Sequence, residues 1–70
     1  MLNVYTSPDC AYCEALLDWL DGLGVPYRQL PAAKLEGLKT TPTTQIGEVY
    51  IPGFNRPAIK RELRAAGLWK

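Results

Sequence analysis

The chain has 70 residues, 47% of them hydrophobic, and a formal net charge of +1 at pH 7. This length predicts one small domain, and the ordinary apolar fraction excludes an intrinsically disordered chain. The small net charge argues against nucleic-acid binding. No apolar run reaches the roughly 18 residues of a membrane span, and no signal sequence is apparent, so we expect a soluble cytoplasmic protein. The absence of histidine excludes Ser-His-Asp and Cys-His catalysis.

The first predicted elements are a strand and a helix. Residues 1–6 form an apolar, strand-like run, and residues 7–9 form a turn whose Asp9 would cap the next helix. The helix extends from Ala11 to about Leu23 and ends before Gly24 and Pro26. Two sets of side chains repeat at helical spacing on opposite faces, apolar at Leu16, Leu20 and Leu23 and acidic at Glu14, Asp18 and Asp21.

Two cysteines, Cys10 and Cys13, stand at the junction of this strand and helix, and they are the only cysteines in the chain. The reactive form of cysteine is the thiolate, and the unpaired N–H groups of a first helical turn stabilise an anion. Cys10 would then attack a partner disulfide, and Cys13 would attack Cys10 to release the reduced partner. The C-x-x-C spacing is typical of a dithiol redox site.

Two other interpretations of the cysteine pair stay open. A structural disulfide of this spacing would contribute at most ~2 kcal/mol, since it closes a very short loop. A zinc ion or a small iron–sulfur cluster needs about four ligands, so only a metal-bridged dimer would suffice, and we expect no metal site within one chain. A third alternative is a non-catalytic binding module.

The middle of the chain predicts three further strands. Residues 26–30 alternate as a short strand, which a right-handed crossover would make parallel to the first. Residues 32–38 predict a turn or two of helix, and residues 39–42 a loop. Two β-type runs, 43–46 and 49–51, predict a hairpin.

The end of the chain predicts a basic helix. A turn at residues 52–55 precedes Pro57, which suits a first helical turn, with Asn55 or Arg56 as the cap. Cations crowd this region, at Arg56, Lys60, Arg61, Arg64 and Lys70, whereas residues 1–27 contain no Lys or Arg. We interpret the cations as a solvated helix face. The element order predicts an α/β domain with a four-stranded sheet and helices on both faces.

Three segments together resemble the glutaredoxins. Residues 10–13, Cys-Ala-Tyr-Cys, are similar to their Cys-Pro-Tyr-Cys site; residues 40–42, Thr-Thr-Pro, resemble their Thr-Val-Pro, whose proline is cis; and residues 51–54, Ile-Pro-Gly-Phe, resemble the Gly-Gly turn after their hairpin. The order is the same, and the likeness covers nearly the whole chain. It implies one glutaredoxin-like domain over residues 1–70, with a minimal thioredoxin fold and a mixed sheet of order 2-1-3-4.

The resemblance also implies an activity, a dithiol thiol–disulfide oxidoreductase that reduces protein disulfides and glutathione mixed disulfides. Cys10 would be the nucleophile and Cys13 the resolving thiol. Residues for substrate or glutathione binding would be Tyr12, Thr41, Pro42, Gly53, Phe54, Asn55 and Arg56. Thr41 would pair its backbone with an extended substrate, and cis-Pro42 would face the sulfurs. We expect a monomer without a bound cofactor, with glutathione as a co-substrate, acting in electron transport and cell redox homeostasis.

Several positions depart from the glutaredoxin pattern. Ser7 stands where glutaredoxins have a Lys or Arg that favours the thiolate and binds a glutathione carboxylate. Asn55 and Arg56 stand where they often have acidic residues that bind the glutathione amino group. Residues 32–38 are fewer than in their second helix, which supplies part of the glutathione site. Asp9, beside the first cysteine, opposes its ionisation.

The segment after the hairpin also resembles a second group. Gly53-Phe54 and Arg56-Pro57 are similar to the Gly-Phe-Arg-Pro of NrdH redoxins, with Asn55 inserted. That resemblance implies a redoxin that takes electrons from thioredoxin reductase and passes them to ribonucleotide reductase. Glutathione and thioredoxin reductase are therefore both candidate reductants.

Overall fold

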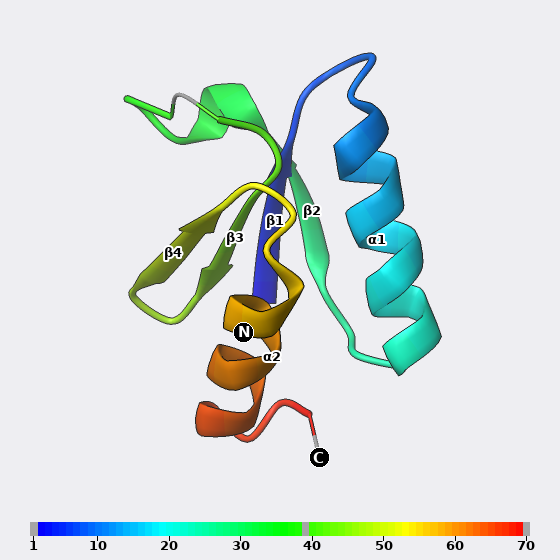
Figure 1. Ribbon diagram of the computed structural model, residues 1–70. Coiled ribbons are helices and arrows are strands. Elements are labelled where there is room, and N and C mark those ends of the chain that lie inside the picture. The colour runs from blue at the N-terminus through cyan, green and yellow to red at the C-terminus, as the bar shows by residue number, and fades with distance from the viewer. Residues whose placement is uncertain (1, 39, 70) are drawn as a thin grey trace.

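The structure is a computed structural model that describes residues 2–38 and 40–69 (Figure 1). Met1 of the predicted first strand, Lys39 of the predicted loop and Lys70 of the basic tail lie outside the described residues. The elements follow in the order β1 (Leu2–Thr6), α1 (Ala11–Leu23), β2 (Arg28–Pro31), η1 (Ala32–Lys34), β3 (Thr43–Ile46), β4 (Val49–Pro52) and α2 (Arg56–Ala65). The described part contains no helix that is long and apolar enough to cross a membrane.

The strands form one mixed sheet of order β2-β1-β3-β4. β2 is parallel to β1, whereas β3 runs antiparallel to β1 and β4 antiparallel to β3. Val4 of β1 lies between Gln29 of β2 and Thr44 of β3, and Thr44 in turn faces Ile51 of β4. The predicted order 2-1-3-4 and the parallel crossover through α1 are confirmed.

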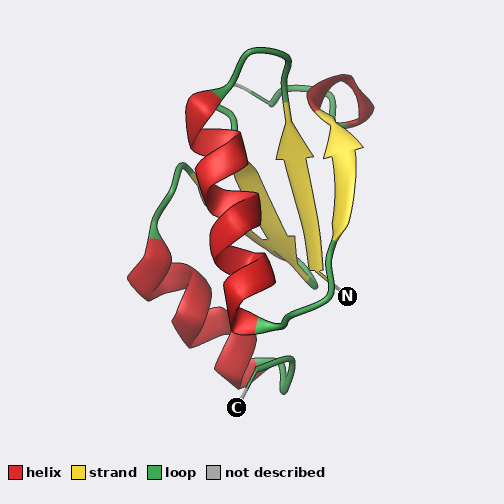
Figure 2. Ribbon diagram, turned by 90° about the vertical axis from the view of Figure 1, so that its right-hand side faces the viewer, coloured by secondary structure: helices red, strands yellow, loops and turns green. Residues whose placement is uncertain are grey.

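Both α-helices cover the same face of the sheet (Figure 2). The core on this face joins apolar side chains from every layer, including Leu2, Val4, Leu16, Leu20, Ile46, Ile51, Ile59 and Leu63. In the described chain, the single 3₁₀ turn η1 lies on the opposite face. Residues 35–38 follow it and line a cleft with Tyr50 and Pro52. The expectation of helices on both faces is therefore met in a reduced form, with one short turn on the second face.

Polar side chains hold the second face of the sheet together. The side-chain oxygen of Gln45 on β3 accepts hydrogen bonds from the Asn3 amide at 3.1 Å and the Tyr5 hydroxyl at 2.9 Å. This arrangement follows from the two-residue alternation of a strand, which turns Leu2 and Val4 to one face and Asn3 and Tyr5 to the other. The two faces of β1 thus differ in chemistry, and the helices pack on the apolar one.

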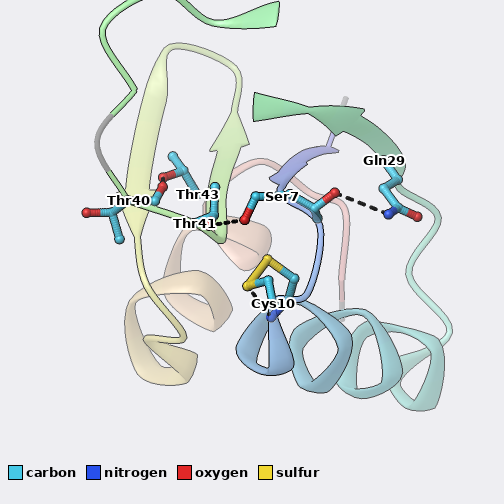
Figure 3. Close-up of a disulfide and its surroundings, with 8 residues drawn as sticks. Ser7, Cys10, Gln29, Thr40, Thr41 and Thr43 are labelled. Atoms are coloured by element: carbon cyan, nitrogen blue, oxygen red, sulfur yellow. Dashed lines mark hydrogen bonds between the residues drawn. A yellow bond between two sulfur atoms is a disulfide. The ribbon is translucent and has the colours of Figure 1, made fainter. Parts of the chain in front are cut away.

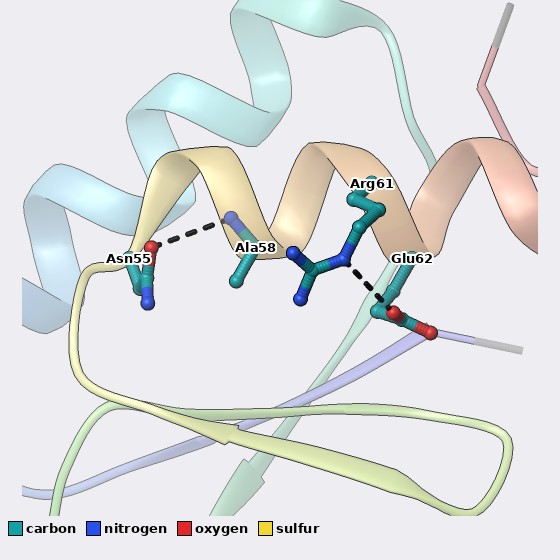
Figure 4. Close-up of polar contacts among 4 residues, drawn as sticks. All are labelled: Asn55, Ala58, Arg61 and Glu62. Atoms are coloured by element: carbon teal, nitrogen blue, oxygen red, sulfur yellow. Dashed lines mark hydrogen bonds and ion pairs between the residues drawn. The ribbon is translucent and has the colours of Figure 1, made fainter.

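Asn55 begins the second helix. Its side-chain oxygen accepts a hydrogen bond from the Ala58 backbone N–H at 3.3 Å, and Arg56 is already the first helical residue (Figure 4). Of the two caps that the sequence left open, Asn55 is the one used. The cap satisfies one of the N–H groups that a helix start leaves unpaired.

Thr44 provides a test of this packing. It is fully buried, and its hydroxyl oxygen has no hydrogen-bond partner in the described part of the chain. Replacing Thr44→Val removes this unpaired polar group while keeping the shape, so we expect the free energy of unfolding in urea to rise by about 1 kcal/mol.

Thr43→Val is the matched control for that change. The hydroxyl of Thr43, which is also buried, donates to the Thr40 carbonyl at 2.6 Å. The free energy of unfolding of this variant should fall by about 1 kcal/mol, because the substitution removes a hydrogen bond of the folded protein. Equal effects of the two substitutions would contradict the assigned partners.

Candidate functional site

A disulfide joins Cys10 and Cys13 at the start of α1, with their Cα atoms 5.2 Å apart. Cys10 is the N-cap residue, with extended backbone angles of φ −106° and ψ 101°. Its sulfur accepts a hydrogen bond from the Cys13 backbone N–H at 3.1 Å. Cys10 is partly buried, whereas Cys13 is only 3% exposed. The arrangement leaves the first sulfur the more accessible one and the second sulfur behind it.

The prediction that Asp9 caps this helix is wrong. Asp9 has φ 56°, in the left-handed region, and therefore belongs to the turn before the helix. An N-cap residue needs extended backbone angles, and Cys10 has them. Aspartate tolerates the left-handed conformation better than most residues, which suits Asp9 to this turn.

The loop before β3 lies next to the disulfide. The Thr41–Pro42 peptide bond is cis, as the glutaredoxin resemblance implies. Pro42 is buried, and its carbonyl accepts a hydrogen bond from the Gly53 N–H at 2.8 Å. This bond ties the loop to the turn that follows β4, where Gly53 has φ 75° and therefore occupies a conformation that favours glycine.

Ser7 joins the same loop to the segment before the cysteines. Its hydroxyl lies 2.7 Å from the hydroxyl of Thr41, within hydrogen-bond distance (Figure 3). Figure 3 shows the disulfide between this contact and the first turn of α1. The sequence identified Ser7 only as the replacement of a cation. Its role as a contact of Thr41 depends on two segments that lie 34 residues apart in the chain.

Five of the predicted binding residues line one cleft of about 310 Å³ beside the disulfide. They are Tyr12, Thr41, Pro42, Gly53 and Phe54, and Thr40, which the sequence analysis did not select, lines the cleft with them. Tyr12, between the two cysteines, is 69% exposed and can contact a bound molecule without any rearrangement. The cleft therefore places an open binding surface next to the reactive sulfur pair.

The other two predicted binding residues lie outside that cleft. The Asn55 side chain is used as the cap of α2. The Arg56 guanidinium lies 5.5 Å from the centre of the Phe54 ring and lines a second cleft, which it shares with Trp19, Pro57 and Lys60. Phe54 thus stands between the two clefts.

Other titratable groups contribute little to this site. Burial raises the pKa of the Tyr27 phenol, as does its hydrogen bond to Asp21, but Asp21 lies near the C-terminal end of α1 and Tyr27 lies in the segment between α1 and β2. Within residues 2–38 and 40–69, no three or more Cys, Asp or Glu side chains gather in a way that could hold a metal ion.

Comparison with family models gives no match, and comparison with curated proteins gives none. Solved structures do match. The thioredoxin-like protein BC3987 superposes with a TM-score of 0.77 at 25% identity, over 90% of this chain and 100% of that one. The NrdH-redoxin of Escherichia coli gives a TM-score of 0.73 at 20% identity, over 86% of this chain and 91% of that one.

A glutaredoxin from buckwheat, solved as a complex with glutathione, matches with a TM-score of 0.73 at 22% identity, over 99% of this chain and 81% of that one. All three similarities extend over most of both chains, and the four-stranded sheet of order β2-β1-β3-β4 fits this likeness. The chain therefore has the thioredoxin fold, in the small form that glutaredoxins and NrdH-redoxin share.

Proposed function

We propose that the protein is a dithiol thiol–disulfide oxidoreductase that reduces protein disulfides. The observation that carries this proposal is the position of Cys10, whose partly exposed sulfur caps α1 and accepts the Cys13 N–H. A sulfur in this position is stabilised as an anion by unpaired N–H groups and by the positive end of the helix dipole. Cys13 lies buried directly behind it, where a resolving thiol is needed.

The reaction proceeds in two exchanges. In the reduced protein, the Cys10 thiolate attacks one sulfur of the substrate disulfide, whose S–S bond breaks; the departing sulfur takes up a proton, and a mixed disulfide remains. Cys13 then loses its proton and attacks the Cys10 sulfur, which releases the second substrate thiol. Two electrons and two protons pass to the substrate. The protein is left with the Cys10–Cys13 disulfide that the structure contains.

The cleft beside the disulfide would hold the substrate chain. The exposed Tyr12 ring and the Phe54 ring both line this cleft and offer apolar contacts. The backbone of Thr41, which also lines the cleft, would pair with an extended segment in the manner of an added strand. This mode fits the proposed reaction, because it fixes the substrate backbone while leaving its side chains free to vary.

We also propose an electron donor for the protein, a reductase of the thioredoxin reductase type. The likeness to NrdH redoxins implies such a donor. Three observations favour it over glutathione. Ser7 is engaged with Thr41 and brings no cation, Asn55 is engaged as a helix cap, and η1 is a single turn of three residues. The E. coli NrdH-redoxin is described as a glutaredoxin-like protein with a thioredoxin-like activity profile, so this fold is compatible with such a donor.

Substitutions of the two cysteines should affect turnover in different ways. Cys10→Ser should abolish insulin reduction, because no nucleophile is left. Cys13→Ser should accumulate a mixed disulfide with the substrate, detectable by mass spectrometry, because nothing resolves it. Both variants should stay folded by circular dichroism, since so short a disulfide loop contributes at most ~2 kcal/mol. If both variants kept wild-type turnover, or if the wild type were a metal-bridged dimer without activity, the proposal would fail.

The donor can be identified by a direct comparison. The oxidised protein should be reduced faster by NADPH and thioredoxin reductase than by millimolar glutathione, as followed by NADPH consumption and by thiol titration. Ser7→Lys should speed reduction by glutathione about two- to fivefold relative to Ser7→Ala, because it adds one exposed cation. Ser7→Ala is the control, since both variants lose the contact with Thr41. Faster reduction of the wild type by glutathione would contradict this assignment.

A further inference from the structure

The two α-helices carry opposite charges on their outer surfaces. α1 exposes Glu14, Asp18 and Asp21, and no Lys or Arg occurs before residue 28. α2 carries four cations at Arg56, Lys60, Arg61 and Arg64 and a single acidic side chain, Glu62. Both helices lie on the same face of the sheet (Figure 2), so the charge separation runs across one surface of the molecule.

Aromatic rings hold three of the four α2 cations in place. The Arg56 guanidinium lies over the Phe54 ring at 5.5 Å, and Lys60 and Arg64 lie over the Trp69 ring at 5.6 and 4.8 Å. Such contacts orient a cation without neutralising it. The cations therefore stay available to an anion while their side chains are already partly ordered.

In the part of the chain that the structure describes, Arg56, Lys60 and Arg64 form no ion pair with an acidic side chain. The ion pair on α2 joins Arg61 to Glu62 at 3.4 Å (Figure 4). Arg56 and Lys60 instead line a cleft of about 400 Å³ with Pro57 and with Trp19 from α1. We call this the basic cleft.

The basic cleft adjoins the cleft beside the disulfide. Phe54 lines the latter, and its ring packs edge-on against Trp19 at 5.9 Å and under Arg56. One aromatic side chain therefore separates the two clefts. A chain that lies beside the disulfide needs to pass only Phe54 to reach the two cations.

We propose that the basic cleft binds an acidic stretch of the protein substrate while the substrate disulfide lies at Cys10. This inference rests on the proposed function and deepens it, because it names the substrate class. Arginine matches the planar geometry of a carboxylate, and a lysine beside it adds a second positive charge. The acidic surface of α1 repels the same stretch from the other helix, so the charges select orientation as well as partner.

The test uses disulfide-linked peptides that differ in charge only. One series carries Glu and Asp on either flank of the cysteine, and its isosteres carry Gln and Asn. The wild-type protein should show a kcat/KM about five- to tenfold higher for the acidic peptides at low salt, through a lower KM. The preference should shrink as salt is added, because the attraction is screened.

Substitutions locate the effect. Arg56→Gln and Lys60→Gln should each lower the ratio of kcat/KM for acidic over neutral peptides, and the double variant should bring it close to one. Arg61→Gln is the matched control, because it removes the same charge from the same helix at a residue that does not line the basic cleft. An equal fall of the ratio in this control would overturn the proposal, since net charge alone would then explain the preference.

A binding measurement separates this inference from the proposed function. Acidic peptides with Ser in place of Cys cannot react, and their binding can be followed by the fluorescence of the two tryptophans, of which Trp19 lines the basic cleft and Trp69 contacts Lys60. If the acidic peptides bind the wild type but not the Arg56→Gln, Lys60→Gln double variant, the basic cleft is supported as the binding site even if no peptide is reduced. Absence of binding, or equal binding of acidic and neutral peptides, overturns it while leaving disulfide reduction untouched.

Discussion

The site depends on one hydrogen bond, from the Cys13 backbone N–H to the sulfur of Cys10 at 3.1 Å. It exists because Cys10 has extended backbone angles and the helix begins at the next residue. Leu16 and Leu20, fully buried in the core, hold α1 against the sheet. The same packing that makes the domain stable therefore also aims the open end of the helix at the sulfur.

The strand register explains why three distant segments meet around this sulfur. Tyr5 near the end of β1 faces Thr43 at the start of β3, and Thr43 faces Pro52 at the end of β4. The segments that follow β1, precede β3 and follow β4 therefore all lie at the same end of the strands. They carry the cysteine pair, the cis-Pro42 loop and the Gly53 turn, and the Ser7–Thr41 contact and the Gly53–Pro42 hydrogen bond join them.

The placement of both α-helices on one face gives the molecule two unlike surfaces. On the helical face, the acidic α1 and the basic α2 lie side by side (Figure 2), and the Trp19 ring of α1 packs edge-on against the ring of Phe54, which precedes α2. On the other face, a single 3₁₀ turn and polar side chains such as Gln45 take the place of a helical layer. The basic cleft adjoins the cleft beside the disulfide, as the proposed binding of an acidic substrate requires.

Local patterns and short spacings in the sequence predict the elements and the sulfur pair at the start of a helix, and the resemblance to glutaredoxins predicts the sheet order. Three features emerge only in the folded chain: Cys10 rather than Asp9 is the cap, Ser7 contacts Thr41, and Asn55 and Arg56 lie outside the cleft beside the disulfide. Those facts depend on backbone angles and on contacts between segments far apart in the chain. Such contacts follow from the register of the assembled sheet, which no local pattern in the sequence contains.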